Sequence, residues 1–194
     1  MRQRLAAVVH AIRATGGRLT WLPWLACTAA VLSPVAGVAQ ANLGELAVKA
    51  TYLYKFPPFV EWPAGGLPAG ENFTLCIVGD DPFGAMLDRA VEGQQVKDRP
   101  IVVRRLAIFN GDGGCQMVYA TGSSAQPVPA ILAALRGKPI LSVTDGERDA
   151  KGMLNFVIAD NRVRFEIDDK TAADSGFVIS SKLLSLASHV RPRL

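Results

Sequence analysis

The sequence predicts an α/β fold, a three-layer single domain with a mixed, mainly parallel sheet, a C-terminal β-hairpin and a terminal helix. Three observations predict it. Short apolar runs alternate with helical patterns between residues 73 and 143. Two later strand patterns flank a turn at Asp160-Asn161. An apolar stretch at helical spacing closes the chain. Strand-helix alternation favours parallel pairing, whereas strands joined by a two-residue turn favour an antiparallel hairpin.

Residues 1–41 are typical of a secretory signal peptide. An uncharged apolar run, Leu19 to Val38, is followed by a small-residue cleavage site at Ala39-Gln40-Ala41. We expect cleavage before Asn42, or alternatively after Ala39, and an exported mature domain of residues 42–194. The basic residues before the run are Arg2, Arg4, Arg13 and Arg18.

Two other interpretations of this leader are weaker. A retained membrane anchor is disfavoured because Pro23 and Pro34 interrupt a run that barely reaches the roughly 20 residues a spanning helix needs. A lipoprotein acylated at Cys27 is disfavoured because Trp24-Leu25-Ala26 is a poor acylation signal.

The charge balance changes when the leader is set aside. The chain has 21 basic and 17 acidic residues, and the excess of four consists of the leader arginines, so residues 42–194 carry 17 of each sign. The high pI therefore gives no argument for nucleic-acid binding.

The mature chain opens with a predicted amphipathic helix. Glu45 and Lys49 form an i, i+4 pair that we place on the face opposite the apolar one. Pro57 and Pro58 end the helix, and the segment from Phe56 to Trp62 is expected to be extended. The apolar face consists of Leu46, Ala50, Leu53 and Tyr54.

Four strands and two helices are expected next. Asp81 is a predicted N-cap, with Pro82 at the first helical position. The strands are Phe73–Val78, Arg99–Ile108, Cys115–Ala120 and Ile140–Val143, and the helices are Phe83–Val91 and Pro129–Leu135.

The last third changes to strands. Met153–Ile158 and Val163–Ile167 are expected to form the hairpin, and a terminal helix is expected within Val178–Leu186. Ser180-Ser181 is the predicted cap of that helix.

Cys76 and Cys115 remain after leader removal, and an exported protein with an even number of cysteines usually pairs them. A disulfide would make the first strand and the start of the third strand neighbours. Metal ligation, the alternative, needs more ligands than these cysteines and the distant His189.

Four polar residues after the first and third strands, Asp80, Asp81, Thr121 and Ser123, resemble a phospho-receiver site in type. The comparison fails because Lys138 begins a strand and no aspartate ends the third strand. Asp80-Asp81 more simply starts a helix. Alternatively, the four residues line a ligand crevice at the strand ends.

Catalysis has little support. His189 is the only histidine after the leader, and no Gly-x-Ser-x-Gly elbow accompanies the serines. No phosphate loop or dinucleotide fingerprint is present, and the charged loop from Asp145 to Lys151 lacks calcium-loop spacing. We predict no catalytic residues, no cofactor and no metal.

Charged and apolar residues alternate along the second hairpin strand. Arg162 and Arg164 belong to its charged face, which is either an ordinary solvent-facing surface or a recognition face.

Together, these segments resemble the YfiR-type family of periplasmic repressors, over essentially the whole mature chain. Two features depart from the family: Lys151-Gly152-Met153 replaces Gly-Gly-Met, and the second cysteine pair of some members is missing. The matching segments are Ala47–Phe56, Phe59–Pro63, Leu75–Gly84, Cys115, Asn161–Ile167 and Ser180–Ala187.

The resemblance implies a non-enzymatic, dimer-forming protein that binds the periplasmic sensor region of an inner-membrane diguanylate cyclase and holds it off. Cyclic-di-GMP signalling, and with it biofilm formation, would fall, and an outer-membrane lipoprotein would relieve repression. The alternative is a periplasmic small-ligand sensor without a cyclase partner. We further expect Phe59 and Trp62 either to brace the first helix on the sheet or to form a docking surface.

Overall fold

The computed structural model describes residues 36–111, 114–146 and 150–193, and the side chains from Asn42 onward. The helices are α1 (Ala36–Lys55), the 3-10 helix η1 (Pro57–Phe59), α2 (Ala85–Val91), α3 (Val128–Leu135), α4 (Asp169–Asp174) and α5 (Ser181–Leu184). The strands are β1 (Val60–Glu61), β2 (Phe73–Gly79), β3 (Gln95–Val96), β4 (Arg99–Leu106), β5 (Met117–Gly122), β6 (Leu141–Asp145), β7 (Leu154–Ala159), β8 (Arg162–Asp168), β9 (Val178–Ile179) and β10 (His189–Arg191).

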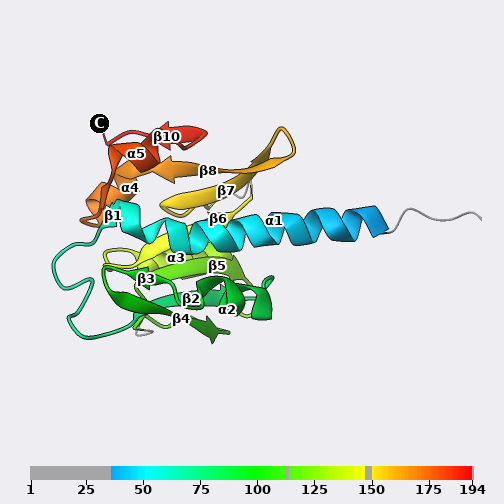
Figure 1. The fold of residues 1–194 in the computed structure, drawn as a ribbon. Coiled ribbons are helices and arrows are strands. Elements are labelled where there is room, and N and C mark those ends of the chain that lie inside the picture. The colour runs from blue at the N-terminus through cyan, green and yellow to red at the C-terminus, as the bar shows by residue number, and fades with distance from the viewer. Residues whose placement is uncertain (1–35, 112–113, 147–149, 194) are drawn as a thin grey trace, which may run out of the picture. The chain divides into compact units, whose positions relative to one another are not determined.

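An eight-stranded sheet in the order β10-β8-β7-β6-β5-β2-β4-β3 organises these elements (Figure 1). Its neighbours pair in parallel except for β7 with β8 and β3 with β4, which are antiparallel. β1 and β9 form a separate two-stranded sheet. The predicted mixed, mainly parallel α/β domain with a C-terminal hairpin and helix is confirmed.

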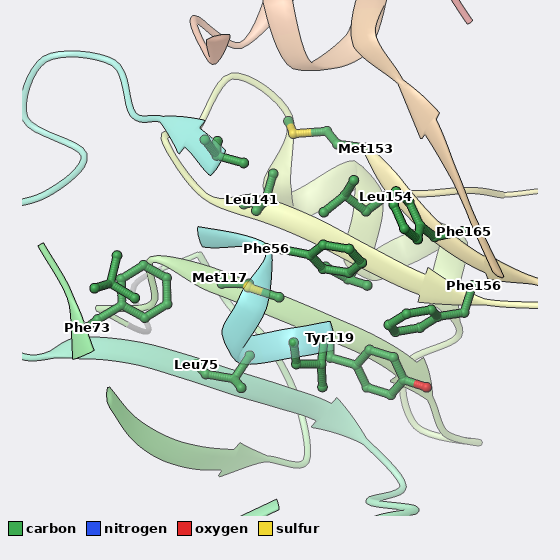
Figure 2. Close-up of a cluster of buried hydrophobic side chains, with 14 of the residues drawn as sticks. Phe56, Phe73, Leu75, Met117, Tyr119, Leu141, Met153, Leu154, Phe156 and Phe165 are labelled. Atoms are coloured by element: carbon green, nitrogen blue, oxygen red, sulfur yellow. The ribbon is translucent and has the colours of Figure 1, made fainter. Parts of the chain in front are cut away.

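Two hydrophobic clusters lie on opposite faces of the sheet, as three layers require. The larger one, under α1 and α2, contains the stacked rings of Phe56 and Phe156 and the edge contact of Phe56 with Phe165 (Figure 2). The smaller one joins Val118 of β5 to Ile131 and other residues of α3. We call the two sides of the sheet the α1 face and the α3 face.

Helix α1 packs on the sheet through the predicted apolar positions, since Ala50 and Leu53 are fully buried. It ends at Lys55, just before the two prolines. The expected extended segment from Phe56 to Trp62 is wrong at its start: Pro57–Phe59 forms a 3-10 turn, and only Val60–Glu61 is a strand. A proline near the beginning of a helix needs no amide hydrogen, so consecutive prolines tolerate this turn.

The predicted pair of Glu45 and Lys49 forms, but its placement on the solvent side is wrong. Lys49 is only 3% exposed, and its ammonium also reaches Asp145 at the end of β6, 2.6 Å away. A long apolar stem allows a lysine to lie beneath a helix when carboxylates meet its charged end.

The turn after β2 also differs from the expectation. Helix α2 begins at Ala85 behind an N-cap glycine, Gly84, with no side-chain cap. Asp81 instead accepts a hydrogen bond from the Phe83 amide and forms an ion pair with Arg105 of β4. The Asp81 carboxylate pairs with Arg105 instead of capping the helix, because Arg105 lies on the neighbouring strand. Local sequence spacing does not reveal this neighbour.

The hairpin of β7 and β8 turns at Asp160 and Asn161, both at positive φ. A two-residue turn of this kind matches the twist of paired strands. The same geometry at Lys97 and Asp98 joins β3 to β4, a hairpin that the sequence analysis did not predict.

The terminal segment is shorter and more varied than expected. The helix spans only Ser181–Leu184, capped by the Ser180 hydroxyl as predicted. The unexpected strand β10 follows, because Ser188 donates its amide to the Phe165 carbonyl and starts parallel pairing with β8.

The leader residues 1–35 lie outside the described residues, and so does most of the predicted signal peptide. Among the helices of the described chain, none combines the length and the apolar character required to cross a bilayer.

Candidate functional site: a polar hollow and a strand-end cleft

The α3 face of the sheet is covered unevenly. Helix α3 packs on β2 and β5, where the second hydrophobic cluster lies. Over β6, β7, β8 and β10 the same face is lined by polar side chains, and a cavity of about 820 Å³ opens between them and the end of α3. We call it the polar hollow. Its polar lining includes Ser142, Asn155, Glu166, Asp168 and His189.

A cross-strand ladder forms the floor of the polar hollow. Register places Thr144, Asn155, Glu166 and His189 side by side on four strands. Thr144 donates its hydroxyl to Asn155 at 2.8 Å, and the Asn155 amide donates to Glu166 at 3.3 Å. Thr144 and Asn155 are almost completely buried, so these bonds offset the cost of burying polar groups.

Two ion pairs border the hollow. Lys151 lies 2.7 Å from the Glu166 carboxylate, and Arg191 lies 3.0 Å from that of Asp168. The hydrogen bond from Lys151 holds the pKa of Glu166 below its ordinary range, despite the opposing effect of burial. The pKa of Asp168 is also lowered: burial opposes the shift, while hydrogen bonds from Thr171 and Arg191 together outweigh it.

The predicted recognition residues lie on the same face, towards the hairpin turn. Arg162 and Arg164 are exposed, whereas Phe165 and Ile167 between the charged positions are buried on the α1 face. Among the described residues, no carboxylate forms an ion pair with either arginine. The two guanidinium groups are therefore available to an outside partner.

A second cavity, the strand-end cleft of about 600 Å³, lies at the carboxyl ends of β2, β5 and β6. Asp80 and Thr121, two of the four predicted crevice residues, line it. Lys49 and Asp145 form its inner wall, and Tyr119 donates its hydroxyl to Asp145 at 3.0 Å. Ligands of open α/β sheets commonly bind at this edge.

The other two predicted crevice residues are engaged elsewhere. Asp81 pairs with Arg105, which also contacts Asp88 of α2. The hydroxyl of Ser123 accepts a hydrogen bond from the Gln126 amide in the turn before α3. The structure thus separates this set into two cleft residues and two turn residues.

Phe59 and Trp62 lie in and just after the short elements η1 and β1, at one end of the domain. Trp62 is half-buried, contacts the edges of Phe73 and Phe177, and donates its indole N–H to the Gln116 carbonyl. Phe59 is also half-buried, with the Lys182 ammonium 5.5 Å from its ring centre. These contacts join η1 and β1 to β2, to the segment around Phe177 and to α5.

Cys76 and Cys115 form the predicted disulfide, with Cα atoms 5.8 Å apart. β2 and β5 are neighbours, as that pairing requires. His189 lies in β10 opposite Glu166. Among the described residues, no cluster of three or more histidine, cysteine or acidic side chains is arranged to bind a metal.

Two of the serines have structural roles. Ser180 caps α5, and Ser123 orders the turn before α3. The sequence analysis missed Lys49, Asn155 and Thr144 as members of polar sites. The signal of Thr144 and Asn155 was a polar residue at a strand position where an entirely apolar buried strand would have none. Lys49 lies in α1, and its partner Asp145 comes from β6, which local spacing does not show.

These features define an α/β domain that is braced by one disulfide and carries polar surfaces on an open half-sheet. A family model described as YfiR/HmsC-like matches residues 46–188. The chain belongs to this family. A search of curated proteins found no match.

Proposed function

We propose that this protein is a non-enzymatic periplasmic regulator. It binds the periplasmic sensor region of an inner-membrane diguanylate cyclase and represses the enzyme, which lowers cyclic-di-GMP signalling and biofilm formation. The observation that carries the proposal is the YfiR/HmsC-like match over residues 46–188, nearly the whole mature chain.

Export to the periplasm has three supports. The disulfide of Cys76 and Cys115 suits an oxidising compartment. Residues 42–44 are exposed on α1, so cleavage before Asn42 leaves the packed part of the helix intact. Asn42 and Glu45 also have the spacing of a capping pair, which suits a helix that begins at the new N-terminus.

The way the polar residues are used supports binding rather than catalysis. The buried polar side chains of the polar hollow bind one another, and the bordering Lys151 and Arg191 are paired with carboxylates. The exposed arginines, Arg162 and Arg164, provide charge for recognition. Phe59 and Trp62 are a second proposed contact area, at the η1 end.

The proposed assembly contains a homodimer of this chain, the cyclase and an outer-membrane lipoprotein that relieves repression. Nucleic acid is not a proposed partner, because residues 42–194 have no net formal charge.

A small-ligand sensor is the second candidate, and the strand-end cleft is the observation that favours it. Asp80 and Thr121 border a cavity of about 600 Å³ at the sheet edge where α/β proteins bind ligands. Such a ligand could also act together with a cyclase partner by changing its affinity.

Capture from inner membranes tests the proposal. Mature protein, residues 42–194, is immobilised under non-reducing conditions, and bound membrane proteins are identified by mass spectrometry. The proposal predicts recovery of a diguanylate cyclase. Recovery of no cyclase from membranes that contain one would leave the ligand sensor as the better account.

A further inference from the structure

The edge of β8 that faces away from β7, here called the outer edge, is only half covered by another strand. Strand β10 pairs with Glu166, Ile167 and Asp168. No described strand pairs with the outer edge of the preceding residues, Arg162 to Phe165.

Backbone groups of this uncovered half point away from the sheet. The Phe165 carbonyl points outward, because it accepts the amide of Ser188 on the side opposite β7. Residues two apart in a strand direct their backbone groups to the same side, so the N–H and C=O of Val163 point outward as well. The edge therefore offers a donor and an acceptor to an added strand.

The side chains beside this edge are positively charged. Arg162 and Arg164 flank Val163 and are exposed, without ion-pair partners among the described residues. Glu166 and Asp168, the acidic residues further along β8, are neutralised by Lys151 and Arg191. The free part of the edge thus carries two uncompensated positive charges.

A second copy of this chain is a poor occupant. Antiparallel pairing of two β8 edges centred on Val163 would place Arg162 opposite Arg164 of the copy, and like charges directly opposite destabilise a strand pair. A strand with acidic residues two apart would instead place a carboxylate beside each arginine. Charge complementarity of this kind selects partners.

We propose that the outer edge of β8 at Arg162–Phe165 receives an extended acidic segment of the regulated protein as an added strand. The proposal rests on the proposed function, because the regulated protein is the cyclase. Backbone hydrogen bonds to Val163 provide attachment, and the two arginines provide selectivity for acidic residues.

Two variants separate the backbone and charge contributions. Val163→Pro removes an amide that does not pair with β7, and proline is tolerated at such an edge position. Val163→Thr is its control, since it keeps the amide. Arg162→Glu with Arg164→Glu reverses the charge. Its control, Arg89→Glu with Lys97→Glu, reverses two exposed charges on other elements.

The first measurement uses a defined probe, the peptide acetyl-Thr-Glu-Val-Glu-Thr-amide, and its glutamine analogue. The wild-type mature protein is titrated by NMR. We expect shifts of the Val163 and Phe165 amide signals with the glutamate peptide, and at least about tenfold weaker binding by the charge-reversed variant. Equal binding of both peptides, or no shift at these amides, overturns the edge proposal.

The second measurement repeats the membrane capture with all four variants and the wild type. The edge proposal predicts loss of the cyclase with Val163→Pro and with the charge-reversed pair, and retention with both controls. If the wild type and the charge-reversed variant both capture the cyclase, the proposal that the partner binds at the β8 edge is wrong. The proposed function as a cyclase regulator is then retained. Peptide binding at the edge without capture of any cyclase overturns the proposed function instead.

Discussion

Lys49 shows how one residue connects two parts of the molecule. It lies beneath α1, is 3% exposed, and joins Glu45 of its own helix to Asp145 at the end of β6. The Lys49–Asp145 pair fastens α1 to the end of β6, beside the strand-end cleft. Removing one partner of a buried charge pair leaves the other charges poorly compensated.

Lys49→Met should therefore lower the free energy of unfolding, by about 2 kcal/mol, because Asp145 and Glu45 lose a charged hydrogen-bond donor while retaining some access to water. Urea unfolding at neutral pH measures the change. Lys55→Met, at an exposed position of the same helix, is the control. Equal stability of the two variants would show that the buried ion pair contributes little.

Glu166 provides a pH-dependent prediction. Its folded-state pKa is lowered from 4.5, chiefly by the hydrogen bond from Lys151. A lowered carboxyl pKa stabilises the folded state above the ordinary pKa, and this contribution is lost as the pH falls through the folded-state value.

Lys151→Gln should raise the pKa of Glu166 and move acid unfolding to a higher pH. Carboxyl NMR titration and unfolding between pH 6 and roughly pH 2 measure the two effects. Lys170→Gln is the matched control, because it removes a lysine paired with Asp174 and leaves Glu166 untouched. An unchanged titration of Glu166 in the Lys151 variant would contradict the assigned cause.

At the scale of the element, β2 and β5 meet closely where both strands end. Gly79 has φ +101°, and a Cβ atom there would collide with the backbone of Gly122. The collision is with backbone atoms, which cannot move aside as a flexible side chain can.

Gly79→Ala should lower the unfolding free energy by about 3 kcal/mol or more, from positive-φ strain together with separation of the strand ends. Gly93→Ala is the control: it also has positive φ but meets open space, so only strain of about 1 kcal/mol is expected. Thermal and urea unfolding compare the two. Similar losses of unfolding free energy in the two variants would mean that the ends of β2 and β5 separate at little cost.

Elements were predictable from the sequence where local pattern decides them. The buried run of β2 and the turn at Asp160-Asn161 needed no knowledge of distant residues. The strand β10 was not predictable, since it exists because Ser188 meets Phe165. Asp81 was misplaced as a cap for the same reason: its partner Arg105 comes from another strand.

The site was less predictable than the fold. Alternation along β8 correctly separated charged from apolar positions, including Arg162 and Arg164. The alternation could not show that α3 covers only half of the α3 face of the sheet. It also could not show that Thr144 and Asn155 join Glu166 in one ladder. Those facts depend on strand order, which the local sequence does not contain.

At the scale of the whole molecule, one disulfide joins β2 to the segment just before β5, its neighbour in the sheet. Cys76 and Cys115 are 39 residues apart in sequence and both are buried. In the chain-entropy model, closing a loop of this length stabilises a domain by roughly 3–4 kcal/mol.

Replacing both cysteines by alanine should therefore lower the unfolding free energy of the mature domain by about 3 kcal/mol. Urea unfolding of this variant is compared with that of the oxidised wild type. Alkylation followed by mass spectrometry checks the starting state, in which no free thiol is expected. Two alkylated cysteines in exported protein would refute the pairing.

The central claim is that the exported domain represses a cyclase from the periplasmic side. Its most direct test is to measure the cellular level of cyclic-di-GMP. The strain used is one whose cyclase was recovered in the membrane capture with the mature domain. We predict a lower level when the full chain is expressed and no change when residues 42–194 are expressed without the leader. An unchanged level with the exported protein, at confirmed periplasmic abundance, would contradict the account.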